Sequence, residues 1–328
     1  MSAVGPVYEA IIGVKDLAAA ERYWAEMGYR PVAHGELDAA TAEQLYGWPR
    51  AARALRLQNG ETAEYSLVRL LEWEELRPGR AADFPPISLA MRWSAALVDG
   101  VVDLYDSFLE GAAAGEPWQV NRLVRGWMGP PDEPPGFFRR PIVMREFLVT
   151  GPETRQVFFG RTGFTRPGYG RVWPSSPRGV SPFTHHGVVL PAEQSLSWFC
   201  DVLGLERRGG RELSDQQEGA RTHLELRPGQ RVLYTQLGAP GFPEGLLFVF
   251  QPLAPAPDAR NVCRPGGQGV TLFSFRTGDL AGVLAASQAL GGQVTPICRN
   301  EFGEPAAGVV LPAGVWWQLI GTAGHPSE

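Results

Sequence analysis

The chain has 328 residues, of which 44% are hydrophobic and 20% are charged, and its formal net charge is -5. A chain of this size can bury ordinary globular cores, and its scattered charges form no basic patch of the kind that binds nucleic acid. No apolar run reaches the roughly 18 residues that suggest a membrane span, and the N-terminus lacks the features of a signal peptide. We therefore expect a cytoplasmic protein without nucleic-acid or membrane partners, whose three cysteines are free thiols.

A local pattern recurs along the chain, in which a short apolar strand is followed by an amphipathic helix that ends at a glycine. In chain order, the copies of this pattern span residues 7–29, 87–111, 184–205 and 269–292. The third copy is the clearest, because its apolar residues recur at three- and four-residue steps and Gly204 follows them. Such regular recurrence predicts a fold built from repeated modules.

Each copy is followed by further apolar runs that turn at Gly or Pro, most clearly over 147–159 and 308–320. We therefore predict four strand-helix-strand-strand-strand modules, at about residues 5–80, 85–162, 183–253 and 268–322. The segment 163–182 is rich in Gly, Pro and Ser and has no periodicity. It is expected to link an N-terminal pair of modules (1–162) to a C-terminal pair (183–328).

These patterns resemble the vicinal oxygen chelate superfamily, the group of glyoxalases, extradiol dioxygenases and bleomycin-resistance proteins. The resemblance is carried by GVKDLAAAERYWAEMGY, SLSWFCDVLGLE, SFRTGDLAGVLAASQALGG and the two hairpins that turn at GPE and PAG. It implies an α+β fold in which four βαβββ modules pair into two half-barrel cups. It also implies a site inside a cup, where members of the superfamily hold a metal ion between the first and last strands of paired modules.

A metal site of this kind requires suitable side chains at the matching positions of this chain. They fall on Glu9 and Arg69 in the first module, Ser88 and Phe158 in the second, His185 or its neighbour His186 and Phe248 in the third, and Leu272 and Gln318 in the fourth. Arginine repels a cation, and the apolar side chains offer no lone pair. We therefore expect no metal and no other cofactor.

A fallback metal site combines His185 with His223 and Glu225, which are two residues apart and would share one face of a strand. This set would support chemistry like that of an extradiol dioxygenase. Simple alternation explains the same residues without a site, because it places His223 and Glu225 on the solvent side of an amphipathic strand.

Three residues are candidates for catalysis without a metal. His185 could transfer a proton to or from a bound ligand, although a single His on an apolar strand can also be structural. Glu9 could act as a base with Arg69 as the partner of a ligand oxygen, or the two could form an internal salt bridge in place of a metal.

The ligand is expected to be a small hydrophobic or aromatic molecule. The side chains proposed to contact it are polar or aromatic and lie in the cups or in Pro/Gly-rich segments: Gln318, Trp316, Phe248, Phe158, Trp127 and Trp173. One hypothesis is a metal-independent enzyme that transfers protons, as a lyase, isomerase or cyclase does. The alternative is a protein that binds a planar aromatic ligand without catalysis, as in the bleomycin-resistance branch. The sequence leaves a homodimer open.

Overall fold

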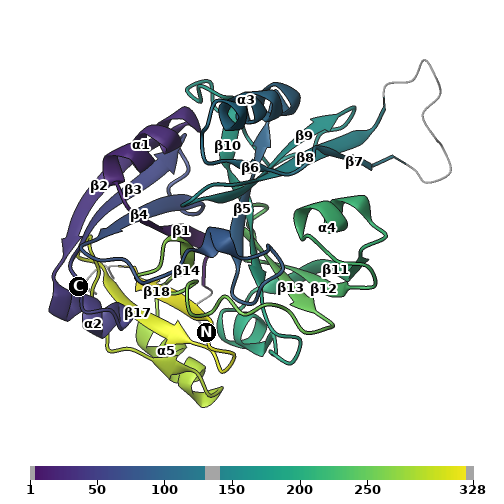
Figure 1. The fold of residues 1–328 in the computed structure, drawn as a ribbon. Helices are drawn as coiled ribbons and strands as arrows, with labels where there is room; N and C mark the ends of the chain where they lie inside the picture. Colours follow the sequence, from purple (N-terminus) through teal and green to yellow (C-terminus); the bar gives the residue numbers. More distant parts are fainter. Residues whose placement is uncertain (1–3, 130–140, 323–328) are drawn as a thin grey trace.

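The computed structural model describes residues 4–129 and 141–322, and its elements repeat the order strand, helix, strand, strand, strand in four modules (Figure 1). The first module contains β1 (Val7–Val14), α1 (Leu17–Glu26), β2 (Tyr29–Leu37), α2 (Ala39–Tyr46), β3 (Ala52–Asn59) and β4 (Leu67–Trp73). After the short helix η1 (Ala81–Asp83), the second contains β5 (Arg92–Val98), α3 (Val101–Ala113), β6 (Gln119–Val120), β7 (Val124–Trp127), β8 (Val143–Thr150) and β9 (Arg155–Thr162).

The second half of the chain repeats this order. The third module contains β10 (Val180–Val189), the helical turn η2 (Trp198–Val202), β11 (Glu206–Ser214), α4 (Glu218–His223), β12 (Arg231–Gly238) and β13 (Leu246–Pro252). The fourth contains β14 (Gly269–Thr277), α5 (Leu280–Ala289), β15 (Gln293–Val294), β16 (Cys298–Arg299), β17 (Pro305–Val310) and β18 (Trp316–Gly321). The predicted architecture of four βαβββ modules is therefore confirmed.

The modules pair differently from the expected order along the chain. One sheet runs β15-β17-β18-β14-β1-β4-β3-β2 and joins the first module to the fourth through antiparallel β1 and β14. The other runs β11-β12-β13-β10-β5-β9-β8-β6 and joins the second module to the third through antiparallel β5 and β10. We call these sheets the terminal cup and the central cup. The expected division into an N-terminal and a C-terminal pair is wrong, and 163–182 connects two modules of the same cup.

Helix boundaries follow the chemistry of their capping residues. Asp16 accepts a hydrogen bond from the backbone N–H of Ala19 (2.9 Å) at the start of α1, and Asp279 does the same for Gly282 (2.9 Å) at α5. After α1, Gly28 has a φ of +86°, which favours glycine. The helix predicted in the third module is reduced to η2, a five-residue π-type turn. Local capping signals therefore mark the starts of α1 and α5 and the end of α1.

The larger apolar core spans both sheets, so the two cups share it. Side chains on the outer faces of β1 and β14, such as Ile12 and Phe273, belong to the same buried cluster as Ala96 and Val188 of the central cup. His186 reaches across this core, with its ring centroid 5.0 Å from that of Phe273. In residues 4–129 and 141–322, no helix is long and apolar enough to cross a membrane.

Candidate functional site

The interior of the terminal cup is filled by the protein's own side chains. Helix α2, inserted between β2 and β3, places Leu45 and Tyr46 in a buried cluster with Ile11 and Leu272 of the central strands. From the other side, Phe302 of the segment after β16 packs against the same cluster. The two inserted segments therefore occupy the space in which the resemblance places a ligand.

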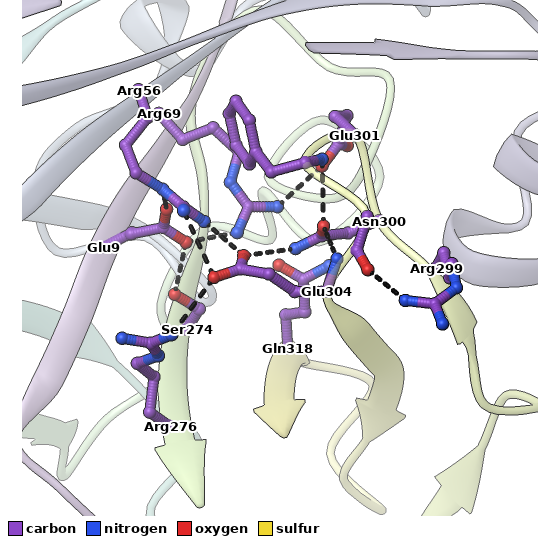
Figure 2. A network of polar contacts seen from close by, with 12 residues as sticks. Glu9, Arg56, Arg69, Ser274, Arg276, Arg299, Asn300, Glu301, Glu304 and Gln318 are labelled. Carbon is purple, nitrogen blue, oxygen red and sulfur yellow. Dashed lines mark hydrogen bonds and ion pairs between the residues drawn. The ribbon is translucent and has the colours of Figure 1, made fainter. Parts of the chain in front are cut away.

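Glu9 and Arg69 meet inside this cup as a buried ion pair (Figure 2). Arg69 also pairs with Glu301 (3.0 Å), while Arg56 pairs with Glu9 (2.6 Å) and Glu304 (2.5 Å). Burial alone would raise the pKa of Glu9, but the two guanidinium groups hold it below its ordinary value. Arg276 also pairs with Glu304 (3.2 Å), so three arginines balance three glutamates in this network.

Gln318 and Trp316 also face this filled interior, whereas Trp317 lies on the opposite face of β18 in the shared core. The Nε2 group of Gln318 donates to the Tyr46 hydroxyl (3.0 Å), which in turn donates to Glu301 (2.6 Å). Trp316 and Gln318 therefore share one face of β18, and Trp317 lies on the other. The structure places both residues within the packing of the terminal cup.

The central cup, in contrast, holds a cavity of about 720 Å³. Its floor is formed by inward side chains of β5, β9, β10, β12 and β13, and its walls by β7, β8, the segment 163–179 and α4. Helix α4 is tied across the cup, since Asn121 donates to the carbonyl of Thr222 (2.7 Å) and Arg122 pairs with Glu218. Small-molecule sites typically have volumes of about 300 to 1,000 Å³, so this cavity is large enough for a small molecule.

His185 projects into this cavity from β10, and His186 points the other way. The Nδ1 atom of His185 lies 2.6 Å from the Tyr169 hydroxyl and 3.0 Å from that of Thr184, which leaves Nε2 for the cavity. Burial lowers the pKa of His185 to about 3, and the nearby charge of Arg166 adds to this effect. The imidazole is therefore neutral at pH 7, and it does not titrate at the ordinary value of about 6.5.

Aromatic rings surround His185 on several sides. Phe248 stacks on it, with ring centroids 4.0 Å apart and planes at 24°. The ring centroids of Phe159 and Tyr169 lie 6.0 and 6.2 Å from that of His185. The cavity is also lined by Trp93, Tyr234 and Phe250. Phe158 does not face the cavity: it stacks on Phe108 of α3 (5.6 Å) on the outer side of the sheet. The site is thus lined by flat apolar surfaces.

Arginines dominate the charged part of the lining. Four of them contribute to the cavity wall, against two glutamates: Arg125, Arg161, Arg166 and Arg211, with Glu146 and Glu218. Within the described ranges, none of the four makes an ion pair, whereas Glu218 pairs with Arg122 outside the cavity. Arg161 and Arg166 lie against the ring of Tyr169, with centroid distances of 5.3 and 4.2 Å. The cavity is positive although the whole chain is negative.

The fallback metal set is not assembled. His223 ends helix α4 instead of lying on a strand, and Glu225 follows it with a φ of +53° and does not line the cavity. His223 does reach the wall, where its Nε2 lies 3.5 Å from Glu146 and both ring nitrogens lack hydrogen bonds among the described residues. In the part of the chain that the structure describes, no three His, Cys, Asp or Glu side chains form a group that could hold a metal.

The two loop tryptophans have different surroundings. Trp127 lies at the end of strand β7 and lines the cavity. Trp173 lies in the segment 163–179 beneath Arg171, whose guanidinium is 3.9 Å from the ring centroid, and next to Gly60 of the terminal cup. Only the first is placed to contact a ligand in this cavity.

Comparisons with solved structures identify the fold. A presumed dioxygenase from Bacillus subtilis subsp. subtilis str. 168 superposes with a TM-score of 0.58 and 11% identity, covering 99% of this chain and 87% of that one. Glyoxalase I from Zea mays gives a TM-score of 0.54 and 16% identity, covering 96% and 92%. No protein-family model and no curated protein matches the sequence.

The chain has the vicinal oxygen chelate fold. The metal site implied by that fold can be tested against the side chains that the central strands of the central cup present to the cavity. These are Trp93 on β5, Val157, Phe159 and Arg161 on β9, His185 on β10, and Phe248 and Phe250 on β13. His185 is the one metal-binding side chain in this set, so the set does not fit a metal ion. The terminal cup has Arg69 bonded to Glu9 and does not fit one either.

The two positions predicted to face the cup in the second module, Ser88 and Phe158, do not line the cavity. Strand β5 begins at Arg92, so Ser88 precedes it, and the Ser88 hydroxyl donates to the carbonyl of Pro85 (2.7 Å). Phe159 takes the inward position expected of Phe158. Sequence reasoning also missed Arg161, Arg166 and Tyr169. Alternation places Arg161 on the same face of β9 as Phe159, so assigning Phe159 to the cavity would also have identified Arg161.

Proposed function

We propose that this protein binds a planar aromatic molecule that carries a negative charge, in the cavity of the central cup. The stacked pair of His185 and Phe248 on the cavity floor is the observation that carries this proposal. Two parallel rings at the surface of a cavity offer a platform on which another flat ring can stack, and such contacts add to the burial of apolar surface.

The preference for a negative charge rests on the arginines. A ligand that enters the cavity loses water from its charged group, and unpaired guanidinium groups compensate that loss because their N–H groups match a carboxylate. Arg161 and Arg166 already lie against the Tyr169 ring, so an aromatic acid stacked beside that ring would bring its acid group near both. A cationic ligand would meet four like charges and two carboxylates.

The test is calorimetric titration with three probes of the same ring system: 2-naphthoic acid, 2-naphthol and 2-naphthylmethylamine. We expect the acid to bind at least about tenfold more tightly than the amine, which corresponds to about 1.4 kcal/mol, with the neutral phenol between them. Equal affinities would remove the charge preference, and no binding of any probe would contradict the proposal as a whole. A Gln318→Leu variant is the control, because Gln318 lies in the terminal cup and binding should be unchanged.

A second candidate function is proton transfer on the bound ligand, and the pair of Glu146 and His223 favours it. Glu146 lines the cavity and has no arginine partner among the described residues, and His223 stands beside it with both nitrogens unpaired. A carboxylate in this position could accept a proton from a carbon next to a carbonyl group, while the neutral imidazole donates to the carbonyl oxygen. His185 was the residue predicted to transfer a proton. With a pKa of about 3 it is a weaker base than an ordinary histidine, whose pKa is about 6.5.

Deuterium exchange separates this candidate from binding alone. The probe is 4-acetylbenzoate, a flat anion whose methyl protons lie next to a ketone, incubated with protein in D₂O and followed by proton NMR. Proton transfer predicts loss of the methyl signal faster than in buffer, and loss of that acceleration in Glu146→Gln. If the probe binds but its methyl protons exchange at the same rate with wild-type protein as in buffer alone, the protein binds this ligand class without proton transfer.

A further inference from the structure

One wall of the cavity, the segment 163–179, is described in full by the structure and contains no helix or strand. Its side chains are therefore not held in place by the hydrogen bonds of regular secondary structure. The Tyr169 hydroxyl lies 2.6 Å from His185 Nδ1 and also interacts with Thr184. The next residue, Gly170, donates its backbone N–H to the carboxylate of Glu244. The place of Tyr169 beside His185 thus depends on a residue from another part of the chain.

Glu244 lies in the turn between β12 and β13 and is only 7% exposed. Its Oε1 atom accepts from Gly170, and its Oε2 atom accepts from the hydroxyl of Tyr65 (2.8 Å). Tyr65 belongs to the turn between β3 and β4 of the terminal cup, where Thr62 interacts with the same hydroxyl. Burial and the charge of Glu244 raise the pKa of Tyr65, so its hydroxyl keeps its proton at pH 7. One buried carboxylate therefore joins the cavity wall to the terminal cup.

The backbone on both sides of this contact is closely packed. Gly170 has a φ of +80°, and a Cβ atom on it would lie 2.7 Å from the Cβ atom of Leu97 on β5. Gly245 follows Glu244 with a φ of +65°, and its carbonyl accepts from the backbone N–H of Val7 (3.0 Å) at the start of β1. Both glycines adopt a conformation that other residues rarely take. The turn that carries Glu244 is therefore fixed to the terminal cup on one side and to the cavity wall on the other.

We infer that Glu244 is a positioning residue for the cavity and that Tyr65 acts through it, an inference that rests on the ligand site proposed above. Glu244 holds Gly170, which fixes the adjacent Tyr169 beside His185, and Arg166 lies over the same tyrosine ring. Glu244 and Tyr65 are not among the described residues that line the cavity. The terminal cup, whose own interior is filled, thereby contributes to ligand binding through its turn between β3 and β4.

Glu244 also acts on the cavity through its charge, and this effect has to be separated from positioning. Its carboxylate favours the charged form of Arg161, so it also opposes the approach of a ligand carboxylate to the same wall. Loss of positioning weakens the binding of every ligand, whereas loss of the charge affects charged ligands only. Tyr65→Phe leaves the charge of Glu244 in place, and a neutral ligand does not respond to that charge. These two conditions isolate positioning.

Calorimetric titration of the variants with 2-naphthoate and 2-naphthol tests the inference. Tyr65→Phe removes one hydroxyl outside the cavity, and we expect it to weaken binding of both probes by about threefold or more. Glu244→Gln keeps an oxygen that can accept from Gly170, so it should weaken binding of the neutral 2-naphthol less than Glu244→Leu, which keeps none. The control is Tyr105→Phe on α3, which removes a hydroxyl from the outer side of the central cup and should bind both probes as the wild type does.

Hydrogen exchange measured by mass spectrometry distinguishes positioning from a general loss of stability. In Tyr65→Phe, we expect the peptide 164–172 to exchange faster than in the wild type, while peptides from α3 and β14 keep their wild-type rates. Faster exchange throughout the chain would overturn the inference, and so would wild-type affinity of Tyr65→Phe for both probes. If the wild type binds neither probe, the proposed function fails, but the exchange of 164–172 still decides whether Tyr65 holds this segment in place.

Discussion

Glu9 and His185 occupy equivalent positions on the first strands of their modules. Glu9 lies opposite Leu67 on parallel β4, and His185 lies opposite Leu246 on parallel β13. Across the joint between modules, they pair with Ser274 and Ala95, respectively. One is neutralised by two arginines in a filled cup, and the other is a neutral imidazole on the floor of a cavity. Equivalent backbone positions therefore serve packing in one cup and line a cavity in the other.

The ion network of the terminal cup should be structural, and Arg69→Met tests this. The variant leaves Glu301 buried without its guanidinium partner, so we expect a loss of about 3–5 kcal/mol in the free energy of unfolding. Urea denaturation measures it. The control is Arg53→Met, which breaks an exposed pair with Glu72 and should cost less than about 1 kcal/mol. Equal effects of the two substitutions would contradict a structural role for the buried network.

Phe248 and Phe158 allow one substitution to be compared on two faces of the central cup. Phe248→Leu removes the ring stacked on His185 and should weaken binding of 2-naphthoate about threefold to tenfold, in line with about 0.5–1.5 kcal/mol for an aromatic pair. Phe158→Leu should leave binding unchanged and lower stability by about 1–2 kcal/mol, because it leaves space beneath α3. Calorimetry and urea denaturation measure the two effects. The reverse pattern would place the ligand on the other face.

The modules and helix ends were predictable because they depend on local chemistry. A capping aspartate, a helical stripe and a closing glycine act within one turn, and Asp16 and Gly28 behave as their residue types suggest. The pairing of modules was not predictable, because all residues of β1 are buried and none of them specifies which module lies beside the first one. The choice between Phe158 and Phe159 was also undetermined. Polar residues lie two positions from each of them, Gln156 beside Phe158 and Arg161 beside Phe159, so alternation alone does not assign a face.

The candidate site was only partly predictable for a related reason. Whether a cup contains a cavity depends on the segments inserted between its strands. The sequence of α2 has no feature that distinguishes a helix that fills a cup from a helix on the surface. The alternation of His223 and Glu225 resembles a strand, but the preceding residues form a helix that ends at His223. His185 and Phe248 both line the cavity, as alternation allows: the adjacent residues His185 and His186 put one ring on each face of β10, and Phe248 shares its face of β13 with Phe250.

The buried histidines should make the protein sensitive to acid. Burial lowers the pKa of His186 to about 3, below the value of about 6.5 expected in the unfolded chain. Between these values the unfolded state binds more protons, so stability rises with pH and is lost as the pH falls below about 6.5. In His186→Asn, the decline in stability between about pH 6 and pH 4 should be shallower by up to about 1.4 kcal/mol per pH unit. Urea denaturation at a series of pH values measures the slope. An unchanged slope would mean that His186 is not desolvated.

The segment 163–179 offers two arginines that test the charge of the cavity. Arg166 lines the cavity over Tyr169, whereas Arg171 stacks on Trp173 outside it. Arg166→Gln should weaken binding of 2-naphthoate by about fivefold to tenfold, about 1 kcal/mol, and reduce its dependence on ionic strength. Arg171→Gln removes the same charge from the same segment and should change neither property. Calorimetry at low and high salt provides both readouts. If the two variants lose affinity equally, the preference for anions comes from the overall field of the segment, and not from a contact in the cavity.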